Sequence, residues 1–238
     1  MFDVIIVAAG SGKRMNLDKN KQLLKIKNKP ILAWSIEQFY NNDRIDNIII
    51  AIREQDRNEI NDILKEYNFE NIHLVPGGKE RQDSIHNCIN KLDELLKKQV
   101  GYTYTQSDRY LIIHDGARPF IDKEIINRTI EETKIHNSIC IGVPSKDTIK
   151  IIDDEKIICQ TPKRESLWCA QTPQSFRLDI IFGAYKNAYE KGFIGTDDAS
   201  LVENMGSKVK MVIGSYENIK VTTIEDLIFA ENIAKNRL

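Results

Sequence analysis

The stretch that decides the fold is residues 3–15, DVIIVAAGSGKRM. Asp3 to Val7 is a run of apolar β-formers that breaks directly into the small residues Ala8 to Gly12, which are followed by Lys13 and Arg14. A buried strand that opens into small residues leaves backbone amides free to hold phosphates, and the cations after it neutralise phosphate charge. The segment is a candidate nucleotide-binding loop. The other interpretation is an ordinary tight turn between a strand and a helix.

The two familiar phosphate-loop patterns do not fit this segment. A Walker loop would have a glycine at Val7 and a hydroxyl residue at Arg14, and the dinucleotide fingerprint would have its third glycine at Met15. The segment therefore belongs to another class of phosphate-binding loop.

Length and composition limit the function classes. The chain has 238 residues, 34 of them basic and 35 acidic, with a net charge of −1. One domain spanning residues 1–238 can bury a full core. The balanced charge gives no overall field for nucleic acid, and no run approaches the ~20 apolar residues of a membrane span, so a soluble protein is expected.

The cysteines predict the compartment. They are Cys88, Cys140, Cys159 and Cys169, and no two of them form a C-x-x-C pair. Scattered cysteines of this kind resemble neither a disulfide scaffold nor a metal site, so a reducing cytoplasm is the expected location.

Strand-like and helix-like runs alternate along the chain, which is the pattern of repeated βαβ units. Such units predict an α/β, Rossmann-like, doubly wound and mostly parallel sheet with ligands at the carboxyl ends of its strands. The expected strands are Val4–Val7, Asn47–Ile52, Ile72–Val75, Tyr110–His114 and Ile139–Val143, with helices near Ile31–Tyr40, Arg57–Tyr67 and Gln82–Lys98.

The pattern changes after Thr148. Two short β-like runs, Ile149–Ile152 and Lys156–Cys159, flank an acidic turn and predict a hairpin arm at about residues 147–165. A lone hairpin cannot bury both faces, so it folds onto the body or reaches into a partner subunit, and we favour the partner. Gly101–Ser107 is predicted to be a surface insertion without an assigned function.

Charged residues gather around the expected sheet edge. Lys21 lies close to Lys13 and Arg14 if the chain folds back, and three cations could cover a triphosphate, although a solvated basic loop is the alternative. Asp115 follows an apolar strand, where it either holds Mg²⁺ or caps a turn while paired with Arg118. Strand alternation directs the neighbouring His114 to the opposite face, so its predicted role is structural.

Three further segments carry candidate residues. Residues 77–84 bring glycines, cations and a helix start together, although Asp83 and Ser84 also suit helix capping. The pair Asp197 and Asp198 opens another helix, where it either caps or touches a ligand. Lys220 stands in a short β-like run, where a cation is costly unless an anion meets it, so a phosphate contact is predicted.

No motif of covalent catalysis is present: the chain has no G-x-S-x-G, C-x-x-C or H-E-x-x-H sequence. The residues favour phosphoryl-group transfer by positioning and charge stabilisation.

Taken together, seven segments in this order resemble the 2-C-methyl-D-erythritol 4-phosphate cytidylyltransferases of non-mevalonate isoprenoid synthesis, over nearly the whole chain. The segments are 8–15 (AAGSGKRM), 21–22 (KQ), 81–84 (RQDS), 114–119 (HDGARP), 172–174 (TPQ), 196–199 (TDDA) and 218–222 (NIKVT). The resemblance implies a protruding β-arm that interlocks a homodimer, and an enzyme that uses CTP and Mg²⁺ and releases pyrophosphate.

The resemblance also implies site residues. Arg14, Lys21 and Lys220 would be catalytic, and Asp115 would hold the metal. The nucleotide would be bound by Ala8, Ala9, Gly10, Ser11, Gly12, Gly78, Asp83 and Ser84. The acceptor would be bound by Arg118, Thr148, Arg164, Thr172 and Thr196, with Thr148 and Arg164 reaching the partner subunit's sugar phosphate.

Departures from the family pattern are small. Gly116 stands where alanine is common, Lys79 where an acidic residue is frequent, and Ile224 where proline often follows the threonines. Two alternatives stay open: a ribitol-5-phosphate cytidylyltransferase of the same fold, and a non-catalytic nucleotide sensor. Retention of Arg14, Lys21, Asp115 and Lys220 together disfavours the sensor.

Overall fold

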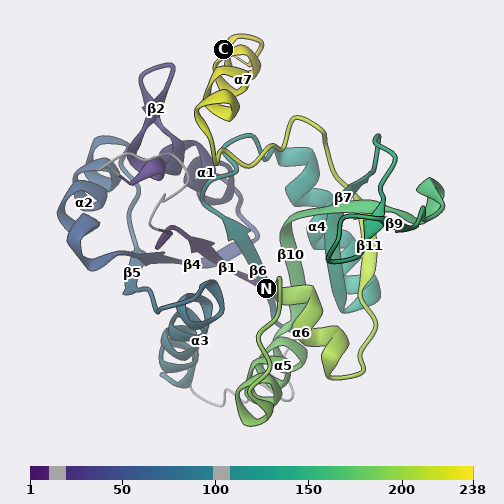
Figure 1. Cartoon of the computed structure of the whole chain (residues 1–238). Coiled ribbons are helices and arrows are strands. Elements are labelled where there is room, and N and C mark those ends of the chain that lie inside the picture. The colour runs from purple at the N-terminus through teal and green to yellow at the C-terminus, as the bar shows by residue number, and fades with distance from the viewer. Residues whose placement is uncertain (11–19, 99–107, 238) are drawn as a thin grey trace.

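The computed structural model describes residues 1–10, 20–98 and 108–237. Its central sheet has the strand order β11-β7-β10-β6-β1-β4-β5 (Figure 1). The strands are β1 Phe2–Val7, β4 Ile45–Ile52, β5 Ile72–Pro76, β6 Tyr110–Asp115, β7 Ser138–Pro144, β10 Trp168–Arg177 and β11 Lys210–Ile213. Neighbours pair in parallel except β10, which is antiparallel to both β6 and β7. The predicted doubly wound, mostly parallel sheet is confirmed.

Helices cover both faces of this sheet. They are α1 Ile31–Tyr40, α2 Arg57–Glu66, α3 Arg81–Lys97, α4 Lys123–His136, α5 Leu178–Lys191, α6 Asp198–Asn204 and α7 Ile224–Lys235. Because side chains of a strand alternate between faces, Val4 and Ile6 of β1 pack with α1, α2 and α4, whereas Ile5 and Val7 pack with α3, α5 and α6. The same alternation places consecutive residues at a strand end on opposite faces.

Smaller elements complete the body. Strands β2 Lys25–Ile26 and β3 Lys29–Pro30 form a separate antiparallel pair, and Ile26 of β2 shares an apolar cluster with α1 and α7. Short 3₁₀ turns lie at Lys21–Leu23 (η2), Glu54–Asp56 (η3) and Arg164–Ser166 (η5). No helix in the described ranges combines the length and apolar character that crossing a bilayer requires.

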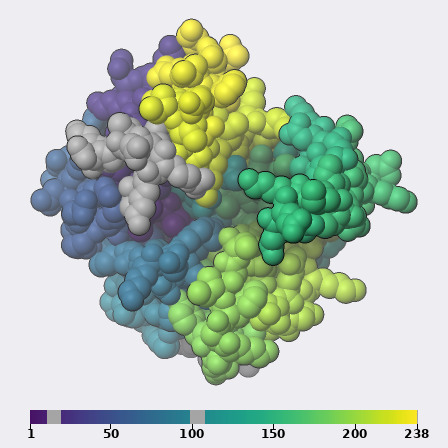
Figure 2. All heavy atoms as spheres, in the orientation of Figure 1, coloured from purple at the N-terminus to yellow at the C-terminus, as the bar shows by residue number. Residues whose placement is uncertain are grey.

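The predicted hairpin arm is confirmed. It consists of β8 Ile151–Ile152 and β9 Ile158–Gln160, paired antiparallel. Figure 2 shows the arm standing out from the body. Its isoleucines at positions 149, 151, 152, 157 and 158 are each 41–61% exposed, so the arm presents apolar surface away from the core of its own chain.

Sequence and structure differ at two places that matter for the site. Strand β10 is not predicted by residue pattern, because its buried residues Gln171, Thr172, Gln174 and Ser175 are polar and interrupt the apolar signature of a strand. The prediction of a β-like run around Lys220 is wrong, because residues 214–223 form a loop. One backbone hydrogen bond, from Val221 N to Ala117 O at 2.8 Å, brings this loop to the end of β6.

A buried ion cluster lies at the amino-terminal ends of the central strands β1, β4 and β6. Arg109 Nη2 lies 3.0 Å from Asp3 Oδ1 and 2.7 Å from Asp46 Oδ2, and the side chain of Asp3 is fully buried. We expect Arg109→Ala to lower the free energy of unfolding by about 3–5 kcal/mol, because it leaves Asp3 buried without its counter-charge.

Urea unfolding would measure this loss. Arg57→Ala is the control, since it breaks the exposed pair with Glu54 and should leave the unfolding midpoint nearly unchanged. Equal midpoint shifts in the two variants would contradict the assignment of a stabilising role to the buried cluster.

Candidate active site

Four strand ends meet at one edge of the sheet. In the parallel register Val7 of β1 lies beside Ala51 of β4 and Asp115 of β6. Backbone hydrogen bonds tie the following turns together: Ala8 N to Ala51 O at 2.8 Å, Gly77 N to Ile52 O at 2.8 Å, and Gly116 N to Val7 O at 3.0 Å. Gly77 is required here, because a Cβ would stand 2.3 Å from the Cβ of Ala9.

Two adjoining hollows open at this edge. The larger, about 540 Å³, is lined by Val7, Ala9, Gly10, Lys21, Gln22, Arg53, Gly78, Lys79, Glu80, Arg81, Ser84, Asp115, Ala117 and Lys220. The smaller, about 310 Å³, is lined by Arg81, Asp115, Arg118, Ala170, Gln171, Thr172, Gln174, Thr196, Asp197 and Lys220. The two share Arg81, Asp115 and Lys220, so one charged cluster forms the wall between them.

Asp115 is the anionic centre of that cluster. Its side chain is 9% exposed, and its two oxygens face Arg81 Nε at 3.2 Å and Lys220 Nζ at 2.7 Å. Burial alone raises the pKa of the carboxyl, but the charges of Arg81 and Lys220 outweigh burial and hold that pKa well below its usual range. Asp115 is therefore ionised at neutral pH.

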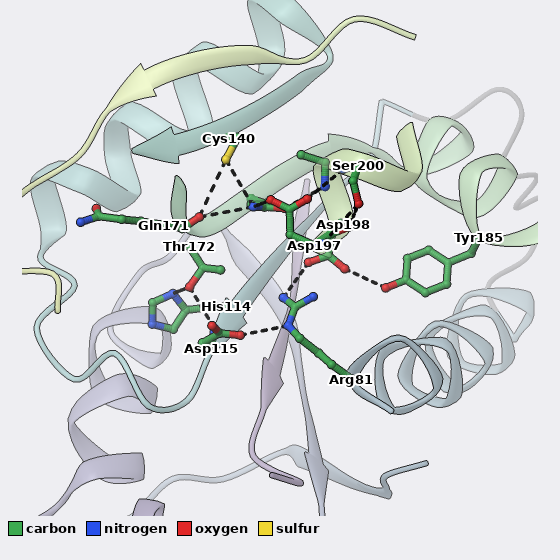
Figure 3. A network of polar contacts seen from close by, with 12 residues as sticks. Arg81, His114, Asp115, Cys140, Gln171, Thr172, Tyr185, Asp197, Asp198 and Ser200 are labelled. Carbon is green, nitrogen blue, oxygen red and sulfur yellow. Dashed lines mark hydrogen bonds and ion pairs between the residues drawn. The ribbon is translucent and has the colours of Figure 1, made fainter. Parts of the chain in front are cut away.

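A hydrogen-bonded relay fixes the backbone beneath Asp115 (Figure 3). The N–H of Asp115 donates to Thr172 Oγ1 at 3.0 Å, and this hydroxyl lies 3.2 Å from His114 Nδ1. His114 Nε2 lies 3.1 Å from the carbonyl of Arg118, which can only accept, so this nitrogen carries the proton. Burial lowers the pKa of His114 to about 4. The imidazole is neutral and faces Phe39, as the predicted structural role requires.

Lys21 reaches the larger hollow because its neighbours are anchored. Asn20 Nδ2 donates to Asp56 Oδ2 at 2.7 Å and to Ala8 O at 3.3 Å, while Gln22 Nε2 donates to Val7 O at 3.2 Å. These bonds pin residues 20–22 to the end of β1, and Lys21 lines the larger hollow.

The turn before α3 uses its predicted residues partly for capping. Glu80 and Asp83 form a capping box, and Ser84 Oγ accepts from Gly78 N at 3.0 Å. Asp83 also accepts from Tyr189 Oη at 2.7 Å. Gly78 and Ser84 line the larger hollow, whereas Asp83 does not.

The predicted acceptor residues divide into two groups. Arg118, Thr172 and Thr196 line the smaller hollow. Thr148 and Arg164 line neither hollow. They lie at the two roots of the arm, where Arg164 Nη2 donates to Thr148 Oγ1 at 3.2 Å, so their own chain does not bring them to the cluster.

The glycine-rich loop is partly outside the described residues. Ala9 and Gly10 line the larger hollow, and Ala8 is buried in the core at the strand end. The predicted residues Ser11, Gly12 and Arg14, together with Lys13, fall within 11–19 and lie outside the described residues, as does the segment Gly101–Ser107.

Sequence reasoning marked Asp198 only as a helix cap or ligand contact, and it missed both Tyr185 and the contact of Asp198 with Arg81. Its Nη2 donates to Asp198 Oδ2 at 2.7 Å, and Asp198 Oδ1 accepts from Tyr185 Oη at 2.7 Å (Figure 3). Arg81 directly follows the glycine turn, which was a usable signal. Asp198 and Tyr185 come from α6 and α5, and only the three-dimensional packing brings them to α3.

Asp115 fits the role of a single protein ligand to a magnesium ion whose other ligands are substrate phosphates and water. Mg²⁺ is usually held by one or two carboxylates plus substrate phosphates and water. Asp115 offers one ionised carboxylate at the wall between the hollows. Within the described ranges, no group of three or more His, Cys, Asp or Glu side chains could hold a metal by itself.

Comparison with known proteins decides the family. The sequence model of the 2-C-methyl-D-erythritol 4-phosphate cytidylyltransferase (IspD) family matches residues 2–236. The chain belongs to this family. It is 49% identical over 234 residues to the Clostridioides difficile member, covering 98% of this chain and 93% of that protein. It is 45% identical over 233 residues to the Bacillus licheniformis member, covering 98% and 95%.

Solved structures of the family share the fold. The crystal structure of 4-diphosphocytidyl-2C-methyl-D-erythritol synthase from Anaerococcus prevotii has a TM-score of 0.81 and 35% identity, covering 98% of this chain and 96% of that one. The Francisella tularensis cytidylyltransferase has a TM-score of 0.77 and 32% identity, covering 96% and 97%. The predicted resemblance is confirmed: the chain is a nucleotidyltransferase of the cytidylyltransferase type, and the ribitol-5-phosphate alternative is not favoured.

The relay under Asp115 yields a stability prediction for this family member. Thr172→Val keeps the shape of the side chain but leaves the Asp115 N–H and His114 Nδ1 buried without the hydroxyl. We expect a loss of about 1–3 kcal/mol in the free energy of unfolding, measured by urea titration. Thr172→Ser keeps the hydroxyl and is the matched control. Equal stability of the two variants would show that the relay contributes nothing.

Proposed function

We propose that the larger hollow binds CTP, that the smaller binds 2-C-methyl-D-erythritol 4-phosphate, and that reaction takes place where they join. The observation that carries this proposal is the sharing of Arg81, Asp115 and Lys220 by both hollows. An oxygen of the acceptor phosphate attacks the α-phosphorus of CTP, the bond from that phosphorus to the β-phosphate oxygen breaks, and pyrophosphate leaves. The product is 4-diphosphocytidyl-2-C-methyl-D-erythritol.

The cations around the junction supply the catalysis. Negative charge grows around the α-phosphorus in the transition state, and a cation fixed beforehand stabilises it without reorganising. Lys220, held by Asp115 at 2.7 Å, and Lys21, placed by the anchored residues 20–22, are the proposed catalytic cations. Arg14 is the third proposed cation and belongs to the loop outside the described residues.

The other proposed binding residues also divide between the two hollows. Gly10, Gly78 and Ser84 line the nucleotide hollow, whereas Arg118, Thr172 and Thr196 line the acceptor hollow. Ala8, Ala9, Ser11, Gly12 and Asp83 complete the proposed nucleotide-binding set. Asp115 would hold Mg²⁺ together with the phosphates of CTP, and the ion would neutralise phosphate charge when bound.

We infer that the chain forms a homodimer through the arm. The exposed isoleucines of the arm need cover, and Thr148 and Arg164 at its roots line neither hollow of their own chain. In a dimer the arm would bury the isoleucines and bring Thr148 and Arg164 to the partner's acceptor hollow. Residues 1–238 then act as one nucleotidyltransferase domain. A cytoplasmic location suits its four free cysteines.

A pyrophosphate-release assay with CTP and Mg²⁺ tests the function. Methylerythritol 4-phosphate and ribitol 5-phosphate are supplied in parallel as acceptors. We expect strong preference for the first. Preference for ribitol 5-phosphate would contradict the acceptor assignment, and release with neither would contradict the enzyme assignment.

Lys21→Ala tests the catalytic cation. Because Lys21 is proposed to act mainly in the transition state, kcat should fall by about a hundredfold or more while CTP affinity changes little. Lys25→Ala is the control, since this exposed lysine lies four positions away and lines neither hollow. A near-normal kcat for Lys21→Ala would end the assignment.

Subunit mixing tests the arm. If Arg164 acts in the partner's site, heterodimers of Arg164→Ala and Lys21→Ala chains contain one site with both residues intact. Activity should therefore rise above that of either inactive homodimer, measured as pyrophosphate release. No recovery in verified heterodimers would place both residues in the site of one chain.

A further inference from the structure

Arg81 is held by two side chains that stand behind the wall of the site. Asp198 binds its Nη2 at 2.7 Å, and Tyr185 donates its hydroxyl to the other oxygen of Asp198 at 2.7 Å (Figure 3). Asp198 and Tyr185 are buried, at 0% and 1% exposure, and neither lines either hollow. Figure 3 shows the three residues arriving from different helices, α3, α5 and α6.

Asp198 is itself fixed by the packing of α6 on the sheet. Gln174 of β10 donates through Nε2 to Asp197 Oδ2 at 2.7 Å, and its Oε1 accepts from Ala199 N at 2.8 Å. Asp197 caps the helix through Ser200 N at 2.9 Å. The residues on both sides of Asp198 are therefore locked to β10, which leaves its carboxylate little freedom to follow a moving Arg81.

Asp115 alone would hold Arg81 weakly. Their contact is a single one, Nε to Oδ1 at 3.2 Å, and Asp115 divides its charge between Arg81 and Lys220. An arginine side chain loses up to about 2 kcal/mol of rotamer entropy when it is fixed in one place. The closer contact to Asp198 is the one that can keep the guanidinium at the junction.

We propose that Asp198 and Tyr185 are positioning residues for the reaction, and that they act through Arg81. This inference rests on the proposed function. Arg81 lines both hollows, so its guanidinium faces the place where the acceptor phosphate and the α-phosphate of CTP would meet. A guanidinium fixed at that place stabilises charge that appears in the transition state. Loosening it should lower kcat more than it weakens CTP binding.

Tyr185→Phe is the sharpest test, because it removes only the hydroxyl and keeps the buried ring. Loss of a hydrogen bond to a charged group is expected to lower kcat about tenfold, with KM for CTP nearly unchanged. The melting temperature should also fall, because Asp198 Oδ1 stays buried without this donor, so kcat is measured below the unfolding range of every variant. Asp198→Asn should have a larger effect on kcat. Tyr40→Phe is the matched control, because it also removes one tyrosine hydroxyl. That hydroxyl accepts from Glu70 N at 3.1 Å, just before the amino-terminal end of β5 and away from the two hollows.

A double-mutant cycle separates positioning from general support of the fold. Arg81→Lys keeps the charge but loses the forked geometry. If Tyr185 acts only through Arg81, then Tyr185→Phe in the Arg81→Lys background should change kcat by less than about twofold. Two results would overturn the inference: a double variant whose kcat falls by the product of the two single effects, or a normal kcat in Tyr185→Phe. In either case an active wild-type chain would still support the proposed function. A wild-type chain that releases no pyrophosphate would overturn both.

Discussion

The site depends on one buried charge. Asp115 lies at the end of a central strand, 9% exposed, and its carboxylate remains ionised only because Arg81 and Lys220 face it. A carboxylate left alone in such a place would cost several kcal/mol. Its two cations are therefore held at the same point, where the two hollows join, before any substrate arrives. Cations fixed in advance suit a reaction that transfers a phosphoryl group by positioning and charge stabilisation.

The fold supplies this arrangement from elements far apart in the sequence. Asp115 comes from β6, Arg81 from the start of α3, and Lys220 from the loop that a backbone bond brings to the end of β6. Antiparallel β10 adds Thr172 beneath Asp115 and Gln174 beside the start of α6. Both hollows thus rest on the same strand ends, which explains how a mostly parallel sheet brings the larger and the smaller hollow into contact.

Sequence patterns predicted much of this and failed for identifiable reasons. The βαβ alternation predicted the sheet, and the rule that ligands bind at strand ends directed attention to Asp115. The polar core of β10 concealed a buried strand, because its glutamines hydrogen-bond to neighbouring segments instead of packing as apolar residues: Gln171 Nε2 donates to Ser215 O, and Gln174 Nε2 donates to Asp197 Oδ2. The anchor of Arg81 was invisible for another reason: Tyr185 and Asp198 have no spacing relation to Arg81, and only tertiary packing joins them.

The two hollows are proposed to hold the two substrates and to meet at the charged cluster. A crystal structure of the chain with CTP bound tests this proposal most directly. We expect the triphosphate in the hollow lined by Lys21 and Ser84, with the α-phosphorus facing Arg81 and Lys220 and the smaller hollow left open for the acceptor. Cytosine or ribose seated between Arg118 and Thr196 would contradict it.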